Sequence, residues 1–532
     1  MAITRKDFLK LGLVAGGAGL APSFGASASP PGGRGNATTG NLLRSVVRLP
    51  KPFRVSLPVP AVLEPVRSDA DADHYEITQK VGKAEILPGL QTEVWGYEGS
   101  FPGPTIESRS GRATIVRQIN ELPVPVSTHL HGGRTPASSD GFPTDLILPR
   151  HRSSEEHSPH AHHGNPDNKA GWSFHRGSKD YFYPLEQRAA TLWYHDHRMD
   201  FTGPQVYRGL AGFHIIRDDE EDELPLPKEK KDVPLMLCDR AFGEGGSFLY
   251  PSLYPSLQGK GGVKEHYMEG VLGDAILVNG VPWPFMEVSN TRYRFRILNA
   301  SNARRYRLAL EPEAPDGLPF VQVGSDGGLL GSPIPHRTIP IAPAERIDVV
   351  IDFSRYPVGT KVTLKNRLGL GTTSRVMRFH VVRKEKEEST VPRRLSDMSA
   401  FQALGESNAR FTRKFRFTQA AHNGHEVWAI NNKVFDPSRI NVRPKLGSTE
   451  IWEFATDVHH PVHLHLAHFK VLSRNGRRPL PKDAGWKDTV DVLPGQVVRV
   501  ISRFDGYRGK YVFHCHNLEH EDMMMMANFR VV

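Results

Sequence analysis

The sequence predicts an all-β protein built from three related sandwich-like domains, and three observations point to this fold. The chain has 532 residues, several times the usual length of a single domain. Its 49 glycines and 42 prolines favour many turns over long helices. A turn signal followed by a proline-containing loop and a β-type strand recurs from Trp95, Val278 and Ile430.

The first 30 residues are predicted to form an export signal that lies outside the fold. Arg5, Lys6 and Lys10 precede a short, glycine-rich apolar run, and Ala26-Ser27-Ala28 is typical of a cleavage site. The pattern resembles a twin-arginine signal with a lysine in the second arginine position. Because the apolar run is too short to span a bilayer, we expect export to the periplasm, cell envelope or extracellular space rather than an uncleaved anchor.

Charge-rich, proline-containing linkers divide the rest of the chain into three predicted domains. These domains cover residues 45–220, 232–384 and 395–532. The first contains an insertion, residues 151–175, with six histidines and no periodicity. Such a segment could gather or deliver metal, but its composition is more typical of a solvated loop.

The composition also narrows the functional class. Two cysteines among 532 residues exclude a disulfide scaffold and a cysteine-rich zinc protein, whereas 25 histidines indicate a metal protein with imidazole ligands. The formal charge of +10 could attract nucleic acid, but no module interleaves basic and aromatic residues. We therefore expect no nucleic-acid partner, no transmembrane segment and a monomeric protein.

Four short motifs carry the candidate metal ligands. Two lie in the first domain and two in the third, at opposite ends of the chain: His129-Leu130-His131, His195-Asp196-His197, His460-Pro461-Val462-His463-Leu464-His465, and His514-Cys515-His516 followed by His520. A single His-x-His motif is weak evidence for a metal site. Four of them together are hard to explain by chance.

Strand geometry separates these side chains into two sites. Side chains two residues apart share one face of a strand, and the residue between them points to the opposite face. His514 and His516 therefore share a face that Cys515 does not. One site is predicted to collect His460, Cys515 and His520, and the other collects the remaining eight histidines of the four motifs.

The ligand types indicate copper. Two imidazoles and a thiolate with a nearby methionine form the set that holds copper in electron-transfer sites. Met525 is the best axial candidate, although Met523, Met524 and Met526 leave that choice open on spacing alone. Eight clustered imidazoles without carboxylates or further thiolates fit structural zinc poorly.

The four motifs, in this order, resemble the ligand signature of the multicopper oxidases. The likeness extends to Phe101-Pro102-Gly103-Pro104 and Trp193-Tyr194, and it covers essentially the whole chain after the signal. Residues 514–522 are most similar to the group of bacterial spore-coat laccases, bilirubin oxidases and phenoxazinone synthases. The resemblance implies three consecutive cupredoxin-like domains, which are Greek-key β-sandwiches.

The resemblance also implies four copper ions and a role for each ligand. Type 1 copper in the third domain would take His460, Cys515, His520 and Met525. Between domains 1 and 3, type 2 copper would take His129 and His463. The type 3 pair would take His131, His195, His197, His465, His514 and His516.

The implied activity is one-electron oxidation of a phenolic or aminophenolic substrate, coupled to reduction of dioxygen to water. Because that reduction consumes protons, the resemblance implies proton delivery by Asp140 and Glu521. On their residue types alone, Asp140 could instead form a turn before glycine, and Glu521 could orient His520.

Three other functions fit parts of the pattern. A cuprous or ferrous ion oxidase for metal tolerance shares the ligand set, but the chain lacks a methionine-rich helix. Bilirubin oxidation or phenoxazinone synthesis could be the specific activity. A structural or cell-division protein of this fold would have lost copper ligands, whereas every ligand position is filled here.

Overall fold

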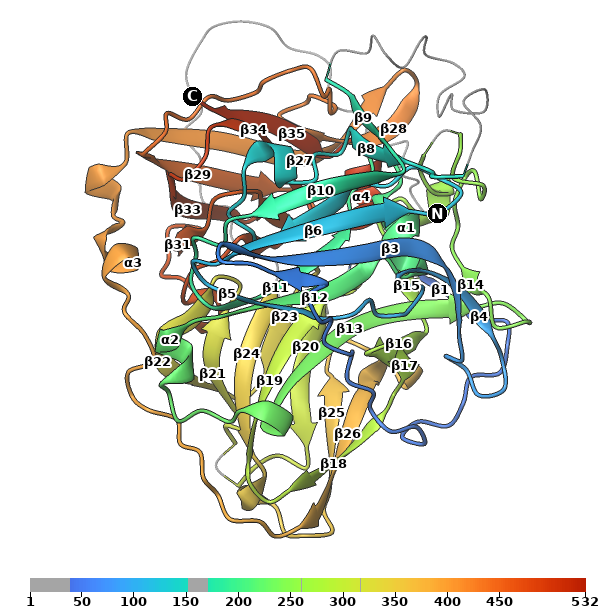
Figure 1. Ribbon diagram of the computed structural model, residues 1–532, viewed down its shortest axis with the longest axis vertical. Coiled ribbons are helices and arrows are strands. Elements are labelled where there is room, and N and C mark those ends of the chain that lie inside the picture. The colour runs from blue at the N-terminus through green and yellow to red at the C-terminus, as the bar shows by residue number, and fades with distance from the viewer. Residues whose placement is uncertain (1–38, 152–170, 260, 316) are drawn as a thin grey trace, which may run out of the picture. The chain divides into compact units, whose positions relative to one another are not determined.

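The computed structural model describes residues 39–151, 171–259, 261–315 and 317–532. The predicted export signal lies outside the described residues, as do His157, His160, His162 and His163 of the histidine-rich insertion. Strands dominate the described residues and the α-helices are short, so the all-β prediction is confirmed (Figure 1). In this part of the chain, every helix falls short of the length and apolarity needed to cross a membrane.

Two sheets face each other in the N-terminal third. The first has the order β10-β6-β3-β2 with β4 paired to β3. It contains β2 (Arg67–Ser68), β3 (Ala72–Ala84), β4 (Thr92–Tyr97), β6 (Ala113–Asn120) and β10 (Ser178–Tyr183). The second, of order β5-β12-β11-β7, contains β5 (Ile106–Arg109), β7 (Thr128–His131), β11 (Ala190–Asp196) and β12 (Ala211–Arg217). Ile77 and Val116 of one sheet pack with Leu130 and Leu192 of the other.

Two larger sheets form the middle third around the largest hydrophobic cluster. The first contains β13 (Asp232–Phe242), β14 (Phe248–Leu249), β16 (Ala275–Val278), β17 (Val281–Pro282), β19 (Arg292–Asn299), β21 (Phe320–Ser325), β22 (Gly328–His336) and β24 (Arg346–Asp352). The second contains β18 (Phe285–Ser289), β20 (Tyr306–Glu311), β23 (Ile339–Ile341), β25 (Lys361–Asn366) and β26 (Arg375–Arg383).

The C-terminal third repeats the arrangement. Its outer sheet contains β27 (Phe411–His422), β28 (His425–Ile430), β29 (Ser448–Thr456), β31 (Phe469–Arg474) and β33 (Val497–Phe504). Its inner sheet contains β30 (His460–Leu464), β32 (Thr489–Val492), β34 (Gly509–Cys515) and β35 (Met526–Val531). Cys515 and Met525 are both buried in the core between these sheets.

The remaining elements connect the three pairs of sheets. The small strands are β1 (Asn41–Leu43) paired with β15 (Val271–Gly273), and β8 (Asp145–Leu148) paired with β9 (Ser173–Arg176). The α-helices are α1 (Thr202–Arg208), α2 (Asp219–Asp222), α3 (Ser399–Ala403) and α4 (Leu518–Asp522). The 3-10 turns are η1 (Ala137–Ser139), η4 (Glu229–Lys231), η5 (Glu265–Tyr267), η6 (Phe353–Arg355), η7 (Gly371–Ser374), η8 (Glu406–Asn408) and η9 (Pro481–Asp483).

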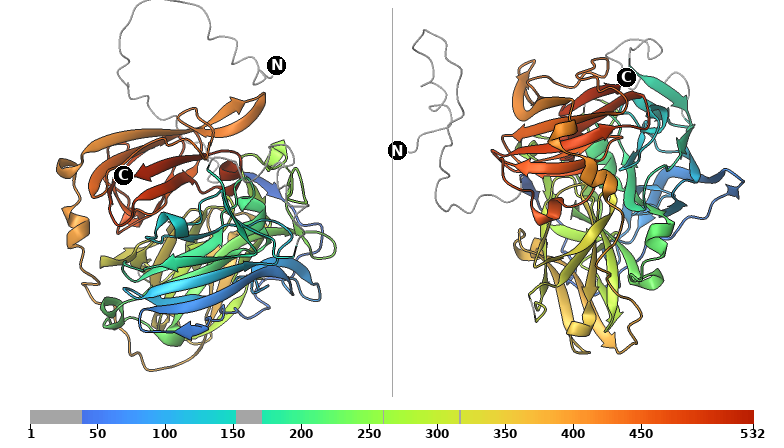
Figure 2. Two further views of the ribbon diagram at one scale, coloured as in Figure 1. Left: turned by 45° about the horizontal axis from the view of Figure 1, so that its top comes forward. Right: turned by 90° about the vertical axis from the view of Figure 1, so that its left-hand side faces the viewer.

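The third pair of sheets contacts both of the others (Figures 1 and 2). Helix α4 of the third pair lies against α1 of the first, where both oxygens of Asp522 accept hydrogen bonds from the first turn of α1, at Thr202 N and Gly203 N (each 2.8 Å). Glu519 of α4 accepts a hydrogen bond from Asn302 of the middle third (2.9 Å). These contacts bring strands from opposite ends of the chain to one place.

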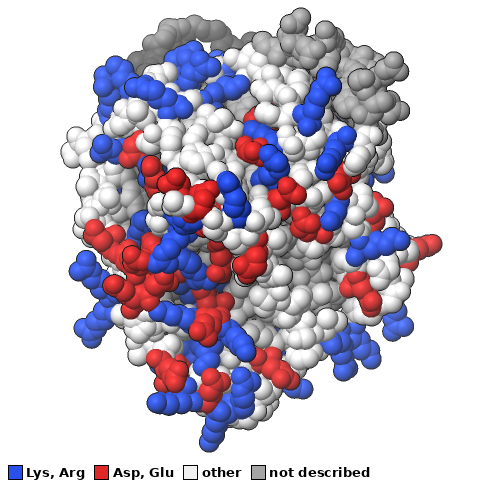
Figure 3. All heavy atoms as spheres, in the orientation of Figure 1, with Lys and Arg blue, Asp and Glu red and all other residues white. Residues whose placement is uncertain are grey.

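On the face drawn in Figure 3, basic and acidic side chains are interspersed over most of the surface. The excess positive charge of the sequence therefore does not gather there into a single stripe.

Candidate metal centres

The two histidine motifs of the first domain lie on neighbouring antiparallel strands. In the β7–β11 ladder, His129 is opposite His195 and His131 is opposite Trp193. The motifs of the third domain are paired in the same way, because His463 of β30 is opposite His514 of β34. Alternation along each strand thus aims two imidazoles per motif at the same side.

Across the boundary between the first and third pairs of sheets, these imidazoles stack on one another. The rings of His129 and His465 have centroids 3.8 Å apart, and those of His131 and His463 are 3.6 Å apart. All eight histidines are buried. The structure therefore brings together the eight side chains that strand geometry assigned to one site.

Within this cluster, the ring nitrogens form three groups. Each residue offers one nitrogen, and the nitrogens of a group all lie within 4.8 Å of one another. The groups are His129 with His131 and His463; His131 with His195 and His516; and His197 with His465 and His514. In the last group, Nε2 of His514 is 3.2 Å from Nε2 of His197 and 3.1 Å from Nε2 of His465.

Backbone carbonyls fix the orientation of four of these rings. The Nδ1–H groups donate to carbonyl oxygens at 2.6 to 3.0 Å, from His129 to Asp140, from His195 to Asp196, from His463 to Asp488 and from His514 to Cys515. The Nε2 atoms of these four rings are thereby left free to face the other histidines of their groups. Fixing one ring nitrogen in this way is how proteins orient a metal-binding imidazole.

The chemistry of the cluster fits metal ions. His131, His195 and His516 each keep a ring nitrogen with no hydrogen-bond partner among the described residues. Leaving a buried polar atom unsatisfied costs about 1–3 kcal/mol, a cost that metal coordination would remove. Burial also lowers the pKa of the rings, to about 4 for both His197 and His514. The rings are thus neutral, as a metal ligand must be.

The second site lies on the opposite side of β34. Sγ of Cys515 is 3.3 Å from Nδ1 of His460 and 3.6 Å from Nδ1 of His520, and these two nitrogens are 3.0 Å apart. All three side chains are buried. Burial raises the pKa of the Cys515 thiol well above its usual value, so a metal ion is needed to hold it as the thiolate.

The two histidines of this second site are held at the ring nitrogens that face away from the sulfur. Nε2 of His520 donates to the carbonyl oxygen of Glu269 (3.2 Å), and Nε2 of His460 is 3.2 Å from Oδ1 of Asp457. The ring of Trp428 stacks on His520, with centroids 3.9 Å apart. Each histidine therefore presents Nδ1 to the sulfur.

Of the four consecutive methionines, Met525 is buried in the same core as Cys515. Its backbone N–H donates to the carbonyl of His520 (3.0 Å), and its carbonyl accepts from Cys515 N–H (3.2 Å). Met526 is buried in a separate cluster with Phe142 and Val512. The packing favours Met525 over Met526 as the axial residue, a choice that spacing alone left open.

Glu521 and Asp140 both contact imidazoles of the histidine cluster. Oε2 of Glu521 is 3.1 Å from Nδ1 of His514, and its Oε1 accepts a hydrogen bond from Thr202 (2.7 Å). Oδ2 of Asp140 accepts a hydrogen bond from Nδ1 of His465 (2.8 Å). Burial raises the pKa of both carboxyl groups.

The sequence reasoning missed Asp488 and Arg346. Asp488 accepts a hydrogen bond from Nε2 of His131 (3.0 Å) and pairs with the guanidinium of Arg346. Asp488 lies in the buried run Lys487-Asp488-Thr489-Val490-Asp491-Val492, in which polar residues outnumber apolar ones, so the local sequence gave no clear signal. Arg346 gave no signal, because it comes from the middle third of the chain.

Among the described residues, the other histidines and Cys238 lie outside the two sites. His175 of the insertion contacts Asp145 (2.7 Å), and the ring of His459 contacts the hydroxyl of Thr39 (2.9 Å). Cys238 is buried in the middle third, where burial raises the pKa of its thiol to about 11. That environment is typical of an inert core thiol.

Comparison with known proteins agrees with this geometry. Two sequence families described as multicopper oxidase match residues 406–532, and residues 78–157 with 173–221. A laccase of Bacillus subtilis is 37% identical over 89% of this chain and 97% of its own. The bilirubin oxidase of Albifimbria verrucaria is 34% identical over 92% of this chain and 84% of its own.

Solved structures give the same result for the fold. A laccase of Pediococcus acidilactici superposes with a TM-score of 0.76 at 31% identity, over 92% of this chain and 96% of its own. The predicted fold of cupredoxin-like domains is thereby confirmed. Proteins of this family use four copper ions of types 1, 2 and 3, and the histidine groups are compatible with such sites. The chain therefore belongs to the multicopper oxidase family and is a laccase-like, copper-dependent oxidoreductase.

Proposed function

We propose that this laccase-like oxidase takes single electrons from small phenolic or aminophenolic compounds at a type 1 site and delivers them to dioxygen at a three-copper site. One observation carries the proposal. Cys515 belongs to one group of ligands, while its two neighbours, His514 and His516, belong to the other. The two sites are therefore joined covalently through the backbone that links Cys515 to His514 and His516.

The grouping of ring nitrogens supports a specific distribution of ligands. His460, Cys515, His520 and Met525 would hold type 1 copper. His129 and His463, whose Nε2 atoms are 3.3 Å apart, would hold type 2 copper. The remaining six histidines divide into two groups of three, one for each type 3 ion: His131, His195 and His516, and His197, His465 and His514.

When bound, copper supplies the one-electron steps and the reduction of dioxygen to water. The chain holds the ligands, keeps bulk water out and supplies protons. Glu521 and Asp140 are placed for the last task, because each carboxyl oxygen lies within hydrogen-bond reach of a ligand ring. The hydrogen bond from His465 to Asp140 also orients that ring, so Asp140 can both hold a ligand and supply a proton.

The surface near His460 suits a hydroxyl- or amine-bearing substrate. Nε2 of His460 is in contact with Asp457, whose side chain is 36% exposed. This carboxylate can accept a hydrogen bond from a phenol or an aromatic amine beside a type 1 ligand. Bilirubin oxidation is a second candidate, favoured by the similarity to the Albifimbria enzyme.

Copper analysis with an optical spectrum tests the metal centres. We expect four copper ions per chain and an intense blue band from the Cys515 site. Full copper loading without that band would contradict the type 1 assignment. A panel of phenols, aminophenols, bilirubin, cuprous and ferrous ions then tests the substrate class, and turnover restricted to the metal ions would overturn the aromatic assignment.

We further propose that the protein is exported by residues 1–30 and acts as a monomer. The basic start, the short apolar run and Ala26-Ser27-Ala28 support export. Amino-terminal sequencing of protein recovered outside the cytoplasm would show a start close to Ala28. Light scattering of the purified enzyme measures the mass of the particle, and the mass of a dimer would contradict the proposed monomeric state.

A further inference from the structure

His131 differs from five other histidines of the cluster, because its hydrogen bond is made by Nε2 and theirs are made by Nδ1. His129, His195, His463 and His514 donate from Nδ1 to backbone carbonyls, and His465 donates from Nδ1 to Asp140. His131 instead donates from Nε2 to Oδ1 of Asp488 (3.0 Å). Its Nδ1 is left without a partner among the described residues, in the group that contains His195 and His516.

Asp488 is itself fixed by Arg346. Nη1 of Arg346 donates to Oδ1 of Asp488 (2.7 Å), and Nη2 donates to Oδ2. Both side chains are fully buried. A two-pronged pair of this kind fixes the plane of the carboxylate as well as its charge, so Oδ1 stays directed at His131.

The guanidinium of Arg346 also joins the three pairs of sheets. Its Nε donates to the carbonyl of Thr191 (3.0 Å) on β11, the strand that carries His195. Its own strand, β24, belongs to the middle third, and Asp488 belongs to the last third. A single side chain therefore sets the position of elements that supply ligands from two domains.

The backbone beside His131 is shaped for this contact. Gly132 has a φ of +87°, and a Cβ on it would lie 2.5 Å from Nη2 of Arg346 and 2.9 Å from Oδ2 of Asp488. Any larger residue would displace the ion pair. The close approach of Arg346 and Asp488 to the chain at His131 thus depends on a glycine.

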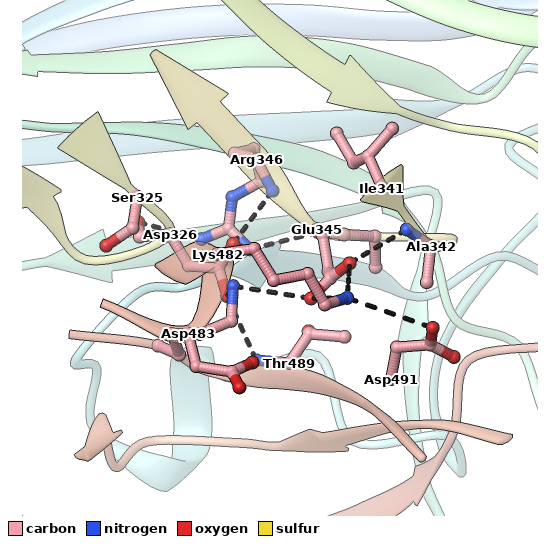
Figure 4. Close-up of polar contacts among 12 residues, drawn as sticks. Ser325, Asp326, Ile341, Ala342, Glu345, Arg346, Lys482, Asp483, Thr489 and Asp491 are labelled. Atoms are coloured by element: carbon pink, nitrogen blue, oxygen red, sulfur yellow. Dashed lines mark hydrogen bonds and ion pairs between the residues drawn. The ribbon is translucent and has the colours of Figure 1, made fainter. Parts of the chain in front are cut away.

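The charged side chains around Arg346 form a paired network, in which Asp326 lies 3.7 Å from Nη1 of Arg346 and also pairs with a lysine. Figure 4 shows Arg346 next to Asp326, and Lys482 between Glu345 and Asp491. Lys487 pairs with Asp326 (3.0 Å).

We propose that Arg346 is a positioning residue for the three-copper site. Acting through Asp488, it holds His131 in the tautomer that leaves Nδ1 available to a metal ion. The proposal rests on the copper sites of the proposed function and adds a residue of the middle domain, which supplies no ligand, to the machinery of that site.

The test compares Arg346→Met and Asp488→Asn with the wild-type protein. Residues that orient a metal-binding histidine typically contribute 10- to 100-fold to metal affinity, so we expect a loss of roughly that size at the three-copper site. Copper per chain, titrated against a chelator, should fall. The blue band should keep its wild-type intensity, since the Cys515 site has no contact with this pair.

Arg304→Met is the matched control. Arg304 is another buried arginine of the middle third, and its Nε donates to Asp239 (2.7 Å), away from the histidine cluster. We expect this variant to lose stability but to keep the copper affinity of the wild type. Arg346→Lys retains the charge without the two-pronged geometry and should lose less copper than Arg346→Met. If Arg346→Met does not fold, the comparison of Arg346→Lys and Asp488→Asn with the wild-type protein tests the proposal instead.

Each outcome is decisive. Wild-type copper affinity in Arg346→Met or Asp488→Asn would overturn the proposal, and so would an equal loss in Arg304→Met. Loss of copper together with the blue band would overturn it as well, because the effect would then not be confined to one site. A wild-type protein without four copper ions or a blue band would instead contradict the proposed function.

Discussion

Cys515 and His514 are consecutive residues of β34, yet their side chains belong to different groups of metal-binding atoms. Sγ of Cys515 is 3.3 Å from Nδ1 of His460, whereas Nε2 of His514 is 3.1 Å from Nε2 of His465. The alternation of side chains along a strand produces this arrangement. One site therefore lies on each face of β34, and the backbone between Cys515 and His514 links the two sites covalently.

This relationship predicts the effect of Cys515→Ser. A hydroxyl is a poor ligand for copper of this type, so the blue band and the oxidation of phenols should both disappear. The histidine cluster on the other side of β34 should keep its copper. Optical spectroscopy with copper analysis measures both effects. Cys238→Ser removes the other cysteine, which lies away from both sites, and should leave the spectrum unchanged.

Met525 is predicted to be the axial residue of the same site. Met525→Leu should keep the blue band but shift the reduction potential of type 1 copper, because the axial ligand tunes that potential. Met526→Leu is the matched control, since Met526 is buried in a different cluster. Redox titration followed at the blue band compares the two variants. A shift in Met526→Leu alone would assign the axial position to Met526.

Removal of the proton-carrying groups should slow turnover. Glu521→Gln and Asp140→Asn keep the size of each side chain, and loss of a positioned acid typically costs 10²- to 10⁴-fold in rate. The blue band should persist in both variants. Glu519→Gln changes a buried carboxyl of the same helix that contacts Tyr250 and Asn302 instead. It should turn over much faster than Glu521→Gln, and equal rates would argue against the role of Glu521.

Acid should destabilise the middle third of the chain, where Asp232 of β13 pairs with Arg296 of β19 (2.8 Å). Burial by itself raises the pKa of the Asp232 carboxyl, but Arg296 and Arg294 more than offset this effect and hold the pKa at about 2. Because the pKa is lower in the folded state than its ordinary value of 3.8, the stabilisation is complete above about pH 4 and is lost as the pH falls towards 2.

Denaturant unfolding at several pH values measures this effect. One such carboxyl is worth roughly 2 kcal/mol of unfolding free energy. The slope of unfolding free energy against pH between 4 and 2 should be smaller in Asp232→Asn than in the wild type. An unchanged slope would show that Asp232 is not responsible.

Local patterns in the sequence were enough to predict the strands and the grouping of the ligands. Glycine, proline and asparagine turns mark where strands end, and the period of two along a strand assigns Cys515 and His514 to opposite faces. These features depend only on neighbouring residues. For the same reason, the sequence indicated Met525 only weakly, because four adjacent methionines have similar local patterns.

The partners of each ring depend on packing between distant segments. His131 contacts Asp488, 357 positions away, and Arg346 joins them from a third domain. Asp522 holds the first turn of α1 from 320 positions away. No periodicity relates such residues, since their contacts form only when separate sheets pack against one another.

The sequence by itself therefore determined the all-β architecture, the metal and the two sets of ligands. Only the tertiary structure decided which nitrogen of each imidazole is free, which methionine is buried in the core with Cys515, and which buried charges hold the rings. The physical reason is that residue type and strand period are local properties. Orientation in a buried cluster is instead set by hydrogen bonds and ion pairs between chain segments that are far apart in sequence.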